Sequence, residues 1–187
     1  MKNLNNSNKK VKAYIGGGMF TDSEIAKRII EEKSLKQNIP NLEIYNPITA
    51  PFNDKSKSSP TSQDIFWGDT NQIIESTYVT AEIEMNTDDG LCYEMGVCSG
   101  INIILDMLKK GLSPKEILDK VPYKQILAHC SDIRLDSKGY TGFDMPFGIN
   151  QFNKGGIESH GKMFRHFNEI TQYIKTENNK NKTEKEI

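Results

Sequence analysis

Short β-prone runs alternate with helical stretches along most of this 187-residue chain, and this alternation limits the possible folds more than any other feature. Val11 to Ile15 is β-prone and is followed by a helical pattern, which begins at a capping box formed by Thr21 and Glu24. Further strands are expected at residues 42–45, 78–84 and 125–129. Strands that are separated by helices pair in parallel. The sequence therefore predicts a three-layer α/β domain of the Rossmann or flavodoxin type, with a mostly parallel central sheet flanked by helices.

The remaining segments define the extent of this single domain. Further helices are expected near residues 63–75, at 90–99, at 114–120 and near 160–175, whereas the apolar run 102–108 fits either a strand or a helix. The polar segment 49–62 is expected to be a functional or mobile loop. Residues 1–10 and 176–187 are polar and low in complexity, so we expect disordered tails on both sides of a domain covering 11–175.

The composition argues against several classes of function. The formal net charge of −1 gives no electrostatic reason to bind nucleic acid or an anionic membrane. The first ten residues lack the apolar core of a signal peptide, and no apolar run approaches the roughly 20 residues of a membrane span. Cys92, Cys98 and Cys130 have no CxxC spacing, so we expect reduced thiols in a cytoplasmic protein.

The sequence also offers little support for a metal or a cofactor. The run Gly16-Gly17-Gly18 matches neither GxGxxG nor GxxxxGK[ST], so we expect it to let a ligand approach the backbone closely without cradling a phosphate. His129, His160 and His166 lack metal-binding spacing and are expected to be structural or exposed to solvent.

The segment 85–96, MNTDDGLCYEMG, contains the strongest candidates for chemistry. Because ligands of parallel sheets gather at the carboxyl ends of the strands, this segment and Gly16–Phe20 should share one edge. Glu94 would lie near a helix N-terminus among apolar residues, which is an environment that suits a nucleophilic carboxylate. The alternative is an ordinary exposed glutamate. Asp88 and Asp89 fit either a turn before the helix or a second carboxyl group of the kind that glycosyl transfer requires.

Several motifs together resemble the nucleoside 2-deoxyribosyltransferase family. A strand with a tyrosine and a glycine-rich turn corresponds to residues 14–22 (YIGGGMFTD), and a DxxxI helix start corresponds to residues 69–73 (DTNQI). The signature D-D/x-G-x-x-x-E-x-G corresponds to residues 88–96 (DDGLCYEMG), and weaker matches are a DxR element at residues 132–134 and an asparagine at position 150. The resemblance extends from about Val11 to Arg165.

The resemblance implies specific roles for these residues. Glu94 would attack C1′ of the deoxyribose to form a covalent glycosyl-enzyme, and Asp88 would exchange a proton with the nucleobase. Asp69 would hold the base, and Tyr14 would orient the nucleophile. The other expected substrate-binding residues are Gly16, Gly17, Phe20, Asp89, Gly90 and, from a neighbouring subunit, Asn150.

The same resemblance implies the partners. The substrates would be 2′-deoxynucleosides and free purine or pyrimidine bases in nucleotide salvage, with no metal and no cofactor. The role of Asn150 implies a homo-oligomer built from dimers, such as a tetramer or a hexamer.

Two other interpretations stay open. The same carboxylates could hydrolyse a 2′-deoxynucleoside or its 5′-monophosphate, for which Arg134 and Lys154 are the plausible nearby cations. The fold could also serve as a non-catalytic nucleoside-binding module. The chain departs from the family at Ser76-Thr77, where an alanine–aspartate pair is common, and in its lysine-rich end, where some members have an aromatic C-terminus.

Overall fold

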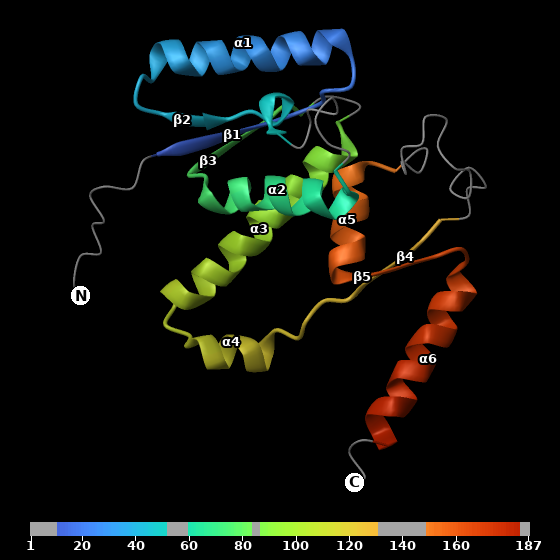
Figure 1. Cartoon of the computed structure of the whole chain (residues 1–187). Helices are drawn as coiled ribbons and strands as arrows, with labels where there is room; N and C mark the ends of the chain where they lie inside the picture. Colours follow the sequence, from blue (N-terminus) through green and yellow to red (C-terminus); the bar gives the residue numbers. More distant parts are fainter. Residues whose placement is uncertain (1–10, 52–59, 84–86, 131–148, 184–187) are drawn as a thin grey trace.

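The computed structural model describes residues 11–51, 60–83, 87–130 and 149–183, with side chains described as far as residue 177. Strands and helices alternate along the described chain (Figure 1). The strands are β1 (Lys12–Gly16), β2 (Glu43–Tyr45), β3 (Tyr78–Ala81), β4 (Ile126–His129) and β5 (Gly161–Phe164). The helices are α1 (Asp22–Asn38), α2 (Ser62–Glu75), α3 (Asp89–Lys109), α4 (Pro114–Lys120), α5 (Gln151–His160) and α6 (Phe167–Thr183), with a short 3₁₀ helix at Pro47–Thr49.

The main sheet has the strand order β2-β1-β3, and both pairings are parallel. All five residues of β1 are buried, as expected for the middle strand of a covered sheet. Figure 1 shows α1 on one side of this sheet and α2 with α3 on the other. The predicted three-layer α/β class with parallel pairing is therefore confirmed.

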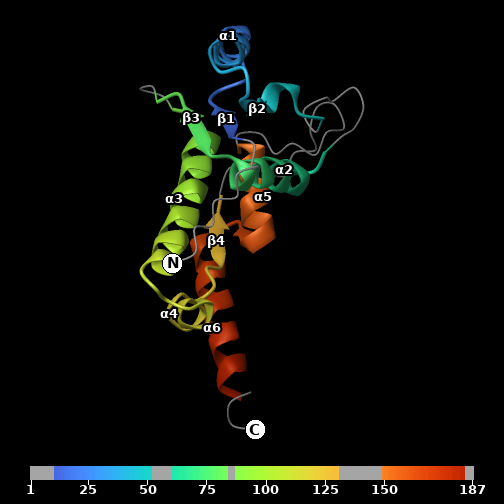
Figure 2. The same cartoon turned by 90° about the vertical axis from the view of Figure 1, so that its left-hand side faces the viewer.

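The strands divide into two sheets, whereas the sequence predicts one. β4 pairs in parallel with β5 and forms a separate two-stranded sheet. In Figure 2, α3 descends away from the main sheet after β3, and α4 follows at the far end of α3. A helix as long as α3 spans roughly 30 Å, so it delivers β4 far from the edge of β3.

The region after Asn150 differs most from the sequence prediction. Residues 151–160 form helix α5 and residues 161–164 form strand β5, whereas the sequence predicts no element at 151–159 and a single last helix from about residue 160. Gly155 and Gly156 make α5 a poor helix by intrinsic propensity, but they allow close packing against Ser62 and Phe66 of α2 and against Tyr93 of α3. The long-range pairing with β4 then makes β5 a strand, and a short local pattern does not reveal such a pairing.

The chain ends differ in part from expectation. Helix α6 runs to Thr183 and so enters the segment that was expected to be a disordered tail, which is rich in the good helix formers Glu and Lys. Residues 102–108 form the second half of α3, which resolves the helix-or-strand alternative. The N-terminal tail, the DxR element with Arg134 and residues 52–59 of the predicted loop lie outside the described residues.

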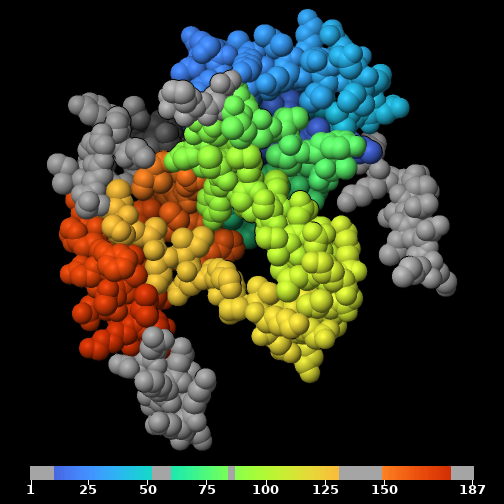
Figure 3. All heavy atoms as spheres, turned by 180° about the vertical axis from the view of Figure 1, so that it is seen from behind, coloured from blue at the N-terminus to red at the C-terminus, as the bar shows by residue number. Residues whose placement is uncertain are grey.

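Helix α3 is long and apolar enough, by length and composition only, to cross a membrane, and it is the one helix of this kind within the described ranges. The expectation that no apolar stretch approaches this length is therefore wrong for α3. Its first turns nevertheless bury Leu91 and Glu94 inside the domain. Its second half carries the exposed side chains Ile103, Leu105 and Leu108, and Figure 3 shows this yellow-green segment at the surface.

Candidate active site

A buried carboxylate that accepts a hydrogen bond from a tyrosine forms the centre of the candidate site. Glu94 lies in the second turn of α3 and is 9% exposed, and Tyr14 of β1 is 0% exposed. The Tyr14 hydroxyl donates a hydrogen bond of 2.5 Å to Glu94 Oε1. The other oxygen, Oε2, faces Gly16, where an added Cβ would lie 3.3 Å from it and only 2.7 Å from Leu91 Cδ1. The glycine at the end of β1 therefore leaves the room that the carboxylate occupies.

A second carboxylate–tyrosine pair lies beside the first. Asp69 of α2 is 2% exposed, and its Oδ1 accepts a hydrogen bond of 2.8 Å from the Tyr45 hydroxyl. Tyr45 ends β2 directly opposite Tyr14 in the parallel ladder. The two rings are stacked, with centroids 5.5 Å apart and planes inclined by 24°. Two acids from different helices are thus held by two tyrosines from adjacent strands.

Burial controls the protonation of both acids. It raises the pKa of Glu94 to about 8, against the opposing effect of the Tyr14 hydrogen bond and with further help from the negative charges of Asp69 and Asp88. Burial also raises the pKa of Asp69 to about 6, while the Tyr45 hydrogen bond acts in the opposite direction. Burial likewise raises the pKa of both tyrosines, so each hydroxyl keeps its proton and remains a donor.

A third acid meets an asparagine next to this pair. Asp88 is the N-cap of α3, and its Oδ1 accepts a hydrogen bond of 3.0 Å from the Leu91 N–H. Asn150 is the N-cap of α5 in the same way, through Phe152 N–H at 2.9 Å. A Cβ at Gly90 would lie 2.5 Å from Asn150 Nδ2 and 2.9 Å from Asp88 Oδ1, so the two side chains converge over this glycine. Burial raises the pKa of Asp88.

The structure thus brings together seven of the ten predicted site residues in two adjoining groups. The first group is Tyr14, Gly16, Asp69 and Glu94; the second is Asp88, Gly90 and Asn150. Asn150 lies beside Gly90 of its own chain, and its role in a neighbouring subunit's site stays a prediction.

The other three predicted residues lie at the periphery. Phe20 is 69% exposed, and Asp89 is an exposed residue in the first turn of α3. Gly17 has a φ of 157° and faces the Arg28 guanidinium, which occupies the place of any side chain there. These three residues are therefore not part of the carboxylate cluster in this structure.

Sequence analysis missed two residues that support this cluster. The sequence predicts only a strand at Tyr45, although a tyrosine on the strand next to that of Tyr14 is a usable signal. Arg28 of α1 is almost completely buried, donates to the Gly16 carbonyl at 2.9 Å and pairs with Glu31 and Glu82. A buried arginine in a helix with many charged residues gives no comparable signal in the sequence.

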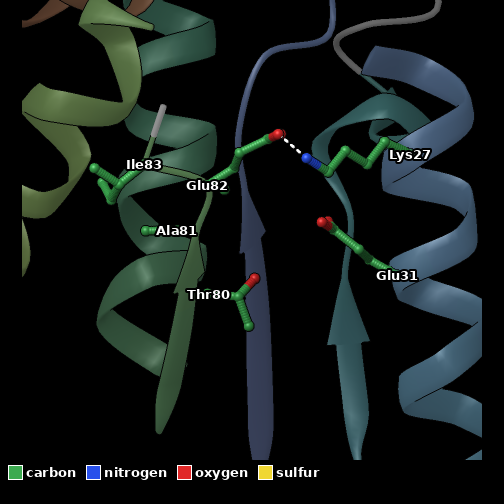
Figure 4. A pocket seen from close by; sticks show the side chains of 7 residues that line it. Lys27, Glu31, Thr80, Ala81, Glu82 and Ile83 are labelled. Atoms are coloured by element: carbon green, nitrogen blue, oxygen red, sulfur yellow. Dashed lines mark hydrogen bonds and ion pairs between the residues drawn. The ribbon is translucent and has the colours of Figure 1, made fainter. Parts of the chain in front are cut away.

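A cavity of about 270 Å³ lies between α1 and the ends of β1 and β3 (Figure 4). Its walls come from α1, the end of β1 and the end of β3: Gly16, Lys27, Glu31, Thr80, Ala81, Glu82 and Ile83. The Lys27–Glu82 ion pair crosses it, as Figure 4 shows. Since its charged side chains are engaged in ion pairs, this cavity offers less chemistry than the carboxylate cluster.

The three histidines lie in structural or solvent-exposed positions, as expected, and His129 and His166 are exposed. His160 packs against Phe66 and Trp67 and lies 2.9 Å from the Tyr123 hydroxyl through Nδ1. His129 packs against Phe167. Within the described part of the chain, no group of three His, Cys, Asp or Glu side chains is arranged to hold a metal ion.

Comparisons with known proteins give relatives without a stated activity. No family model matches the chain. An uncharacterized protein of Ureaplasma parvum serovar 3 is 29% identical over 139 residues, which cover 65% of this chain and 87% of that protein. A solved structure described as a conserved protein from Enterococcus faecalis V583 is 18% identical, with a TM-score of 0.44 over 89% of this chain and 98% of the other.

Proposed function

We propose that this chain transfers the 2-deoxyribosyl group of a 2′-deoxynucleoside to another free nucleobase through a covalent intermediate on Glu94. The observation that carries the proposal is the buried Glu94 carboxylate, bonded to Tyr14 at 2.5 Å, with two further acids close enough to raise its pKa. A nucleophilic carboxylate with a second carboxyl group nearby is the arrangement that retaining glycosyl transfer requires.

In the first step, ionised Glu94 attacks C1′ of the deoxyribose. The bond between C1′ and the base nitrogen breaks through an oxocarbenium-like transition state, and its electron pair leaves with the base. A proton from Asp88 neutralises the leaving base. General-acid help of this kind contributes on the order of 10²–10⁴ in rate. The sugar is then held as an ester of Glu94.

In the second step, a new base attacks the same carbon from the side that the first base left. Its proton passes to Asp88, and the Glu94 carboxylate is released. Two inversions give net retention at C1′. At the end of each cycle Asp88 therefore carries its proton again and Glu94 is again a free carboxylate.

Tyr14 prepares the nucleophile. Its hydrogen bond to Oε1 favours the ionised form of Glu94 and fixes the orientation of the carboxylate, so that Oε2 is the oxygen left to react. Gly16 keeps the space beside Oε2 open, because any larger residue would meet Leu91 and the Thr80 carbonyl.

The hydrolase alternative differs in what receives the sugar. A 5′-monophosphate substrate would need a cation, and Lys154 already pairs with Glu158 at 3.4 Å. Arg134, the other candidate cation, lies outside the described residues, so the donor that we propose is the neutral 2′-deoxynucleoside, which needs no such cation.

The test is incubation of the purified protein with a 2′-deoxynucleoside donor, with and without a second free base, followed by chromatography. We expect a new 2′-deoxynucleoside only when the second base is present. Release of free deoxyribose at the same rate in both reactions would instead identify a hydrolase. Glu94→Ala should abolish product formation while the protein stays folded. The control Glu158→Ala, which changes an exposed glutamate, should keep full activity. Full turnover by Glu94→Ala would refute the role of this carboxylate.

A further inference from the structure

Tyr45 and Tyr14 together hold the two buried acids of the site, although only Tyr14 was predicted to have a role. The Tyr45 hydroxyl donates to Asp69 at 2.8 Å, and its ring lies against the ring of Tyr14. Each tyrosine therefore fixes one carboxylate directly, and the stacked rings connect the two pairs.

We propose that Tyr45 is a positioning residue of this site: it holds the Asp69 carboxylate in place and, through Asp69, couples β2 to the charge state of Glu94. The coupling is a property of the folded cluster, whereas the part that concerns catalysis rests on the proposed function. Among the described residues, no hydrogen bond joins Tyr45 to Glu94, so the effect of Tyr45 on Glu94 must pass through Asp69 and the Tyr14 ring.

The surroundings of Asp69 leave Tyr45 as its hydrogen-bonding support. Among the described residues, the charged or titratable groups that act within this cluster are Tyr14 from β1, Tyr45 from β2, and Asp88, Glu94 and Cys98 from α3. Helix α5 packs against α2 through Gly155 and Phe152, which are uncharged. Lys12 of β1 is bonded further along α2, to Gln72 and Glu75. The negative charge of Asp69 is therefore stabilised mainly by the Tyr45 hydroxyl.

Loss of that hydroxyl has opposite consequences for the two acids. In Tyr45→Phe, the ring and its stacking remain, but Asp69 loses the hydrogen bond that favours its ionised form, so it should gain a proton at higher pH. A protonated Asp69 no longer repels the negative charge of Glu94, so Glu94 should ionise at lower pH. A residue with a merely structural role would move neither titration.

The test follows both carboxyl groups directly. Carboxyl carbons of Asp and Glu are labelled with ¹³C, and their chemical shifts are titrated in the natural protein, in Tyr45→Phe and in the control Tyr78→Phe, which alters an exposed tyrosine on β3. We expect the Asp69 midpoint to rise by about one pH unit and the Glu94 midpoint to fall in Tyr45→Phe, with no change in the control. Unchanged midpoints in Tyr45→Phe would overturn the proposal.

A second variant covers a failure of Tyr45→Phe to fold. Asp69→Asn removes the negative charge and keeps the Tyr45 hydroxyl, so it should lower the Glu94 midpoint as Tyr45→Phe does; an unchanged midpoint would overturn the coupling. The pH profile of deoxyribosyl transfer gives the catalytic readout, and its limb from Glu94 should move with the NMR midpoint. Shifted midpoints in a protein that transfers no sugar would support the coupling and refute the proposed function.

Discussion

The raised pKa of Glu94 predicts that this carboxylate lowers the stability of the folded protein at alkaline pH. Its pKa is about 8 in the folded chain and near 4.5 when solvated. The folded state therefore binds the proton more tightly, and stability falls as pH rises between these two values. At about 1.36 kcal/mol per pH unit, the difference corresponds to roughly 5 kcal/mol. Relaxation and water entry reduce such energies, so we expect about 2–4 kcal/mol.

Glu94→Gln removes this ionisation with little change of shape, because the amide oxygen can still accept the Tyr14 hydrogen bond. At pH 5 the variant and the natural protein should have similar free energies of unfolding. At pH 9 the variant should be more stable by about 2–4 kcal/mol, which for a chain of this length raises the melting temperature by about 5–15 °C. The same substitution should abolish transfer.

Melting temperatures measured by calorimetry or circular dichroism at several pH values between 5 and 9 check this prediction. The matched control is Glu158→Gln, which neutralises an exposed glutamate of α5 and should change the melting temperature little at any pH. If the difference between Glu94→Gln and the natural protein is the same at pH 5 and pH 9, the carboxylate is not buried as described and the reasoning fails.

Three other substitutions test the site. Tyr14→Phe removes the 2.5 Å bond to Glu94, so the pKa of Glu94 should rise further and the pH profile of kcat/KM should move to higher pH; an unmoved profile would contradict the role of Tyr14. Gly16→Ala places a methyl group 2.7 Å from Leu91 Cδ1 and should cost about 1–3 kcal/mol in urea unfolding, whereas unchanged stability would mean that this turn is looser than described. Asp88→Asn keeps a good N-cap, so the stability of the protein should not change. Departure of the base should slow by about 10²-fold or more, and the alkaline limb of the pH profile, which reports loss of the proton from Asp88, should disappear. A retained alkaline limb would assign the proton to another group.

The sequence predicted the parts of the molecule that depend on local patterns. The first strand, the Thr21 capping box and the helix at 114–120 appear as expected, because their signals lie within a few residues. The motifs predict Glu94 and Tyr14 as site residues, and in the structure a hydrogen bond joins the two side chains. Their catalytic roles stay predictions.

The parts that depend on distant partners were not predictable. Strand β5 is a strand because it pairs with β4, and α5 forms despite two glycines because it packs on α2. The Tyr45–Asp69 hydrogen bond depends on the register that places Tyr45 opposite Tyr14 and on the packing of α2, which brings Asp69 to the Tyr45 hydroxyl. Such pairings depend on tertiary contacts, which a single sequence does not specify.

The one-to-one pairing of Tyr14 with Tyr45 has a consequence for how this chain tolerates changes in length. Neighbouring residues of a strand point to opposite faces, so one extra residue within Glu43–Tyr45 would turn the second phenol away from its acid. Extra residues at 39–42, between α1 and β2, would leave the ladder intact. An insertion scan should therefore find that the connector tolerates extra residues and that the strand, which is only three residues long, does not. The length of this strand thus sets the distance between the two acids.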